Sequence, residues 1–147
     1  MTETTRLDIR LRIDFGSASS LGPGKVALLE HIERAGSLSQ AARELGLSYR
    51  RAWQLLDDLN RSFRDPVASA SVGGVGGGGV QLTAFAKELI AAYRRVESAA
   101  LDETRTQFAS LIKAVEPERS LRSRLRRFLT RRAPKARKAP AARSRAH

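Results

Sequence analysis

The segment from Ser48 to Gln54 reads Ser-Tyr-Arg-Arg-Ala-Trp-Gln and combines side chains that suit nucleic-acid recognition. Arginine can donate two hydrogen bonds to guanine, and glutamine can pair with adenine, whereas hydroxyl groups suit phosphate oxygens. Arg50 and Gln54 are therefore candidate base-reading residues. Ser48 and Tyr49 are candidate phosphate contacts, and Arg51 is a candidate contact beside them.

The glycine run from Gly73 to Gly79 has two interpretations. Residues 74–79 match the G-x-G-x-x-G dinucleotide fingerprint, with Glu97 about 20 residues further along the chain. However, no βαβ unit can be assembled around the run, and no Gly-Lys-Ser/Thr follows it, which excludes a Walker A loop. A flexible hairpin tip that meets DNA is favoured. The candidate contacts in this tip are Gly76, Gly77 and Gly78.

The sequence contains few residues that could support catalysis or bind a metal ion. The chain has no cysteine, and its two histidines are too few for a histidine-rich metal cage. A lone histidine such as His31 is more typical of packing or of the surface than of catalysis. Asp57 and Asp58 point about 100° apart on a helix, so they do not form a pair for acid–base work. We therefore expect no enzyme activity, no metal and no cofactor.

The elements that must position these residues follow from the hydrophobic pattern. Residues 25–35 are predicted to form a helix that ends at Gly36, and residues 37–45 a short second helix that a capping box opens. Ser48 is a good N-cap for a third helix to about residue 63. The second and third helices have the proportions of a helix-turn-helix. Candidate DNA contacts at the start of the second helix are Ser37, Ser39 and Gln40.

A helical wheel orients the third helix. Its apolar face consists of Ala52, Leu56, Leu59 and Phe63. Within about 40° of the opposite pole lie Arg50, Gln54, Asp57 and Arg61. Trp53 lies on a flank, where packing at the base of the hairpin is favoured over an indole contact with phosphate. An ordinary solvated face is the alternative interpretation of this helix, and the neighbouring helix and hairpin weigh against it.

Strands are predicted on both sides of the three helices. Residues 7–15 alternate apolar and charged types, which predicts a half-buried strand, and residues 16–24 are predicted to be a loop. Residues 66–72 and 80–82 would flank the glycine run as the two strands of a wing.

Residues 83–115 have an apolar pattern longer than that of the usual globular helix, which Pro117 would end. A helix of this length without a covering domain favours a second copy of the chain as its partner. The sequence therefore predicts a homodimer through this helix.

Most of the net charge of +12 lies at the C-terminal end, since residues 117–147 contribute +11 and residues 1–116 only +1. Residues 120–132 could form a short basic amphipathic helix, and the composition from residue 133 on predicts disorder. Nonspecific DNA binding is the favoured role of this tail. A solvating tail, or an anionic membrane surface for residues 120–132, are the alternatives.

The combination of Gly36-Ser-Leu-Ser-Gln-Ala-Ala42, Ser48-Tyr-Arg-Arg-Ala-Trp53 and the glycine run up to Thr83 resembles a known family. It is similar to the N-terminal DNA-binding domain of the ModE molybdate-responsive regulators, over about residues 7–97. The resemblance implies a LysR-type winged helix-turn-helix, DNA binding and dimerisation. Two features depart from the family: Val75 stands where a basic residue commonly interrupts the glycines, and no oxyanion-binding domain follows Val115. We therefore expect that the chain does not bind molybdate and that any molybdenum signal arrives through another component.

The sequence thus predicts a mainly α fold with a small antiparallel β wing. Its parts would be a winged helix-turn-helix over residues 1–82, a dimerisation helix over 83–116 and a basic, largely disordered tail over 117–147. With no secretory signal and no apolar run of membrane-spanning length, a cytoplasmic, nucleoid-associated protein is expected. Sequence-specific regulation of transcription is the favoured function. An architectural DNA-binding protein, whose tail supplies most of the affinity, is the alternative.

Overall fold

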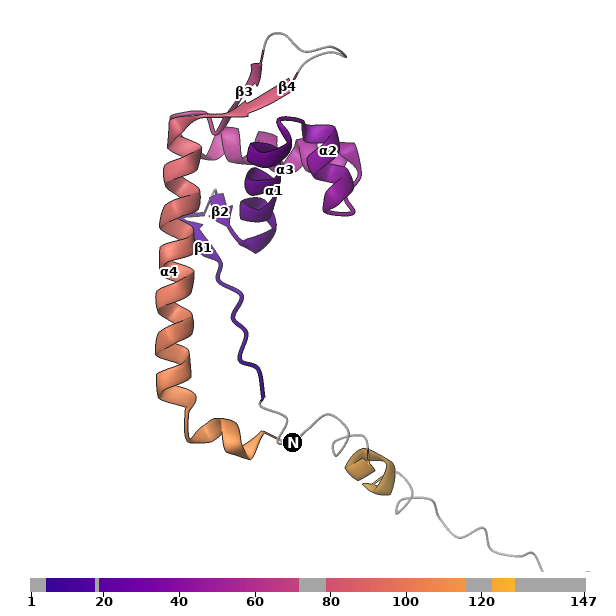
Figure 1. Cartoon of the computed structure of the whole chain (residues 1–147), viewed down its shortest axis with the longest axis vertical. Helices are drawn as coiled ribbons and strands as arrows, with labels where there is room; N and C mark the ends of the chain where they lie inside the picture. Colours follow the sequence, from indigo (N-terminus) through magenta and orange to yellow (C-terminus); the bar gives the residue numbers. More distant parts are fainter. Residues whose placement is uncertain (1–4, 18, 72–78, 116–122, 129–147) are drawn as a thin grey trace, which may run out of the picture. The chain divides into compact units, whose positions relative to one another are not determined.

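The computed structural model describes residues 5–17, 19–71, 79–115 and 123–128. Residues 6–108 form one compact unit, and the described residues 5, 109–115 and 123–128 belong to a second. The elements in chain order are β1 (Ile13–Phe15), β2 (Ser19–Leu21), α1 (Pro23–Ala35), α2 (Leu38–Glu44), α3 (Tyr49–Ser62), β3 (Ala68–Ser71), β4 (Gly79–Leu82), α4 (Ala84–Phe108) and the 3-10 helix η1 (Leu111–Ala114) (Figure 1). None of the described helices is both long enough and apolar enough to cross a membrane.

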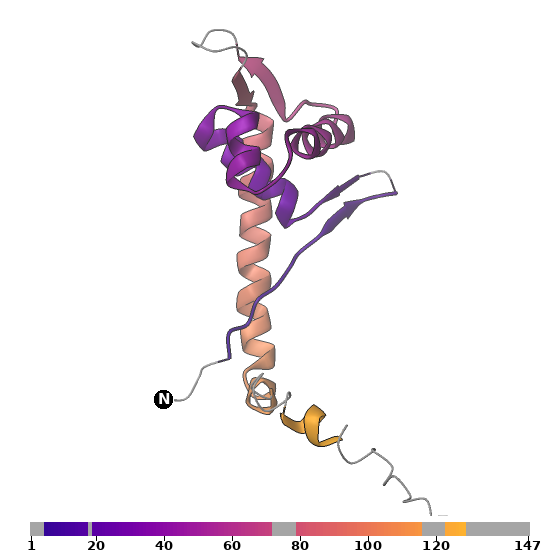
Figure 2. The ribbon, with the colours of Figure 1, turned by 90° about the vertical axis from the view of Figure 1, so that its right-hand side faces the viewer.

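The mainly helical fold with its small antiparallel hairpins is a winged helix-turn-helix, as predicted. The hairpin β3–β4 is the wing, and the hairpin β1–β2 lies on another side of the layer formed by α1, α2 and α3 (Figure 2). The core between these elements and α4 is apolar, and no polar or charged side chain of the described residues is fully buried.

Local sequence signals set the boundaries of the three helices. Gly36 ends α1 in the left-handed region, with φ of 63°, where glycine avoids the strain of a Cβ atom. Ser37 caps α2 by accepting a hydrogen bond from the Gln40 N–H at 3.3 Å. The Gln40 side chain donates to Glu44 instead, so half of the predicted capping box is formed. Ser48 caps α3 by accepting from the Arg51 N–H at 3.1 Å.

The prediction of a strand over residues 7–15 was wrong in its extent. Only β1 pairs, and its partner β2 lies in the segment predicted to be a loop, with Ile13 opposite Leu21. Upstream of β1 the apolar side chains are half-buried and the charged ones exposed, so the alternation itself is real. Alternation reports which face of an extended chain is covered; it does not report whether a neighbouring strand completes the backbone hydrogen bonds.

The extended N-terminal segment is tied to α4 by one hydrogen bond. The hydroxyl of Tyr93, which is 1% exposed, donates to the Leu11 carbonyl oxygen at 2.8 Å. Tyr93→Phe should lower the free energy of unfolding by about 1 kcal/mol, because the carbonyl loses its partner. Chemical denaturation measures this change. Tyr49→Phe is the matched control, since Tyr49 is 57% exposed. Equal stability of the two variants would contradict the assignment.

The wing is anchored to the helices at its base. The Val80 N–H donates to the Gly36 carbonyl oxygen at 3.2 Å, which links β4 to the α1–α2 junction. Thr83 caps the N-terminus of α4, because its hydroxyl oxygen accepts a hydrogen bond from the Ala86 N–H at 3.2 Å. The same hydroxyl group donates a hydrogen bond to the Pro66 carbonyl oxygen at 2.7 Å. The orientation of the wing is therefore fixed from both of its strands.

The prediction of one continuous helix over residues 83–115 was also wrong in its extent, because α4 ends at Phe108. The side chains of residues 105–111 are exposed, so no packing energy holds the helix there. In addition, the hydroxyls of Thr104 and Thr106 donate to backbone carbonyls four residues earlier, an arrangement that slightly destabilises helices. The apolar spacing continues past Phe108, but it is not sufficient to continue the α-helix.

A two-bond ion pair joins α1 to α4. Arg94 donates to both carboxylate oxygens of Glu30, at 2.7 and 2.8 Å, and this hydrogen bonding holds the pKa of Glu30 below its ordinary value. The pair should therefore stabilise the fold above about pH 4.5 and lose that contribution as the pH falls through the lowered pKa. Glu30→Gln should cost about 1 kcal/mol at neutral pH and less in acid. Thermal unfolding between pH 3 and 7 tests this, and a pH-independent cost would contradict it.

Candidate nucleic-acid interface

The residues that α3 buries determine which of its side chains face the solvent. Ala52, Leu56 and Leu59 lie in the core, as the wheel predicted, and Phe63 packs partly buried against it. This rotation leaves Arg50 and Gln54 exposed in the first two turns of the helix.

The cationic side chains at the start of α3 are available to bind a ligand. Arg50 and Arg51 are exposed, and neither guanidinium has an ion-pair or hydrogen-bond partner among the residues that the structure describes. Asp57, an acid on the same face, is paired with Arg61 at 2.9 Å, which offsets its charge. The first turns of α3 therefore present positive charge that no described acidic residue compensates, beside the amide of Gln54, which has no hydrogen-bond partner among the same residues.

The three candidates at the start of α2 differ in their availability. Ser39 is exposed, whereas Ser37 is half-buried and its oxygen is engaged in the helix cap. The Gln40 side chain donates to Glu44 at 3.1 Å and accepts from Arg43 at 3.2 Å. Ser48, at the start of α3, is exposed. Ser39 and Ser48 are thus exposed serines of the helix-turn-helix, although the Ser48 oxygen also accepts the cap hydrogen bond from the Arg51 N–H.

The wing candidates Gly76, Gly77 and Gly78 lie outside the described residues. On the described part of the wing, Ser69 and Gln81 are exposed and lie opposite each other in the β3–β4 register. This pair was not predicted from the sequence. Period-two alternation in β4, with Leu82 buried and Gln81 outward, is the signal that could have found Gln81.

Trp53, which was predicted to pack at the base of the wing, is 50% exposed, and Tyr49, one helical turn earlier, is 57% exposed. Both lie on the same flank of α3. A wheel gives the direction of a side chain, but it does not give how much of that side chain the neighbouring elements cover.

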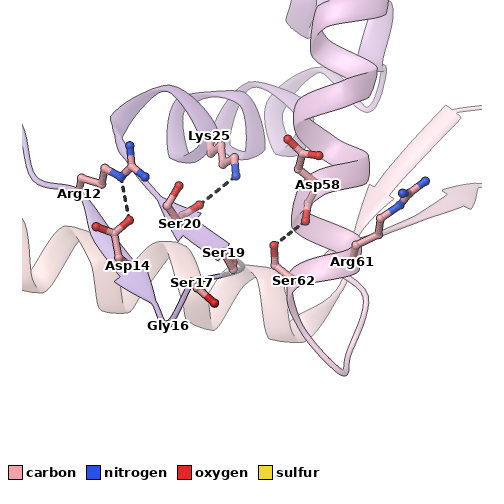
Figure 3. A pocket seen from close by; sticks show the side chains of 10 residues that line it. All are labelled: Arg12, Asp14, Gly16, Ser17, Ser19, Ser20, Lys25, Asp58, Arg61 and Ser62. Carbon is pink, nitrogen blue, oxygen red and sulfur yellow. Dashed lines mark hydrogen bonds and ion pairs between the residues drawn. The ribbon is translucent and has the colours of Figure 1, made fainter.

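A polar hollow of about 630 Å³ lies on the other flank of α3 (Figure 3). Its lining is Arg12, Asp14, Gly16, Ser17, Ser19, Ser20, Lys25, Asp58, Arg61 and Ser62. Lys25 and Asp58 face each other across it, and Arg12 pairs with Asp14 at 2.8 Å. This mixed charge suits water and small polar solutes better than the uniformly negative edge of a nucleic-acid duplex. Within the described ranges, no group of three or more His, Asp or Glu side chains could hold a metal ion.

Comparison with known proteins agrees with this geometry. Residues 24–87 match the family described as "Bacterial regulatory helix-turn-helix protein, lysR family". This match spans α1, α2, α3, the wing and the start of α4. Residues 24–87 are therefore a LysR-type helix-turn-helix domain.

Three curated relatives are similar to the N-terminal part of the chain. The molybdenum transport protein ModE of Azotobacter vinelandii is 38% identical over 93 residues, which are 63% of this chain and 34% of the relative. The molybdenum-pterin-binding protein MopB of Rhodobacter capsulatus is 45% identical over 82 residues, 56% of this chain and 30% of the relative. The DNA-binding transcriptional dual regulator ModE of Escherichia coli K12 is 38% identical over 71 residues, which are 48% of this chain and 27% of the relative. The chain thus spans about a third of the length of these relatives, and the resemblance inferred from the sequence is confirmed for that part.

Proposed function

Because residues 24–87 are a LysR-type helix-turn-helix domain, we propose that the chain binds double-stranded DNA in a sequence-specific manner and regulates transcription. The observation that best supports this function is the exposed first two turns of α3, where Arg50 and Gln54 stand beside Arg51 and have no partner among the described residues. Arginine and glutamine are the side chains that read guanine and adenine in the major groove.

In the proposed complex, α3 enters the major groove with its N-terminal turns against the base edges. Arg50 and Gln54 read bases, and Ser39, Ser48 and Tyr49 contact phosphates. Ser37, Gln40 and Arg51 flank these contacts, and the wing tip at residues 76–78 lies against the adjacent backbone. The helix N-terminus favours negative charge, so a phosphate near Ser48 is electrostatically matched.

The proposed assembly is a homodimer through residues 83–115, with residues 1–82 reading DNA and residues 117–147 adding nonspecific affinity. Two exposed apolar side chains on α4 support this pairing, Val96 and Phe108, each of which is 48% exposed. A two-fold dimer would place its half-sites on one face of the DNA, one or two helical turns apart. Sedimentation at two ionic strengths tests the dimer.

The finer proposal is that the regulated genes concern molybdenum, and that the signal reaches the chain through a separate component. Its support is the identity of two relatives, a molybdenum transport protein and a molybdenum-pterin-binding protein. Calorimetry with molybdate should show no saturable binding by the chain at micromolar concentration. Stoichiometric binding of molybdate to the chain would overturn the proposal that a separate component receives the signal.

Selection from a library of random duplexes with the full chain tests the proposed function. We expect enrichment of a two-fold symmetric motif after a few rounds. The second candidate function, an architectural DNA-binding protein, is favoured by the net charge of +11 on residues 117–147. An architectural protein would retain all duplexes equally. If no motif is enriched, the architectural function replaces sequence-specific regulation.

A further inference from the structure

Two exposed aromatic residues, Tyr49 and Trp53, lie one turn apart beside the base-reading face of α3. Within the described part of the chain, the Trp53 indole has no hydrogen-bond or ring partner, and half of the residue is open to solvent. On the helical wheel Trp53 lies about 60° from Arg50, so one approaching surface can meet both side chains.

The contacts of Asn60 show which neighbouring element this flank of α3 faces. Asn60 follows Trp53 by seven residues, which brings it to nearly the same direction two turns later. Its side-chain oxygen accepts hydrogen bonds from the N–H groups of Val67 at 2.8 Å and Ala68 at 3.3 Å. These residues lead into β3, so the flank faces the strand that begins the wing. Trp53 therefore lies on the wing side of the base-reading face.

We propose that Trp53 is a specificity-determining residue whose indole ring covers the methyl group of a thymine at the wing-side edge of each half-site. This inference rests on the proposed function, because it requires α3 in the major groove. The thymine methyl is the apolar group that the major groove presents, and apolar side chains recognise it. A broad ring with one N–H is suited to covering that methyl, whereas the neighbouring arginines are suited to phosphate and guanine.

Thymine-to-deoxyuridine exchange tests the contact directly, since it removes only the methyl group. The duplex is the one that the full wild-type chain enriches from the random library. Each thymine of one half-site is exchanged in turn, and binding is measured for the wild type, Trp53→Phe and Trp53→Ala. At one position we expect the wild type to bind about fourfold more weakly, the loss expected for one buried methyl group. Trp53→Ala should be insensitive there, and Trp53→Phe should keep part of the sensitivity.

Trp53 is the chain's only tryptophan, so its fluorescence provides a second measurement on the wild type. Binding of the enriched duplex should protect the indole from acrylamide quenching. Asp58→Asn, on the opposite flank of α3, is the matched control and should behave like the wild type in both experiments. Circular dichroism confirms that each variant is folded, which is expected because Trp53 is half exposed.

The outcomes separate this inference from the proposed function. If no motif is enriched by the wild type, the proposed function itself fails. If a motif is enriched but every exchange affects the wild type and Trp53→Ala equally, the thymine contact is overturned while the proposed function stands. An indole that remains fully quenchable in the complex would also overturn the contact.

Discussion

Arg50→Ala should weaken binding to the enriched duplex about 5- to 150-fold, the equivalent of about 1–3 kcal/mol, and should change binding to random DNA much less. The reason is that a bidentate contact with guanine contributes mainly to discrimination between sequences. The stability of the fold should be unchanged, because Arg50 is exposed and has no partner in the described part of the chain. Fluorescence anisotropy with labelled duplexes measures both affinities.

Arg61→Ala is the matched control for this substitution. Arg61 lies on the same face of α3 but in its last turn, and it is already paired with Asp57. Its loss should change the ratio of specific to random affinity by less than about threefold, as expected for an exposed pair. Equal losses of Arg50→Ala on both duplexes would show that Arg50 contacts only phosphate, and the base-reading role would have to be abandoned.

Removal of residues 117–147 should produce the other large effect. The truncation deletes a net charge of +11 but leaves α3 and α4 intact. Affinity for all duplexes should fall together, and the slope of log K against log salt should flatten by about 0.9 for each phosphate that the tail no longer neutralises. The enriched motif and the dimer should remain. Titrations at several salt concentrations measure the slope.

A full-length variant with the lysines and arginines of residues 117–147 replaced by glutamine separates charge from length. It should behave like the truncated chain. If the motif disappears in either variant while the remaining chain is folded and dimeric, the tail takes part in recognition. The architectural function would then describe the protein better than sequence-specific regulation.

The helix-turn-helix could be predicted from the sequence because its signals are local. Ser48 and Gly36 act on the backbone next to them, and the apolar face of α3 fixes which residues are turned outward. The candidate residues on α3 therefore appear where the wheel placed them. Such signals need no knowledge of distant segments.

The features that the sequence did not reveal depend on what lies beside a segment and not on the segment alone. β1 pairs with β2, the strand that follows it, and the helical end at Phe108 depends on where packing stops. The exposure of Trp53 depends on what neighbouring elements leave uncovered. The pattern of apolar residues describes one segment of the chain. It does not describe the neighbouring segments that pair with it or cover it.

Mapping of the DNA bound by the full chain across the genome of its own cell tests sequence-specific regulation most directly. We expect a small number of sharp sites that share a two-fold symmetric consensus, and binding at the same sites should be weakened in the Arg50→Ala variant. Diffuse coverage of the genome, unchanged by Arg50→Ala, would contradict it.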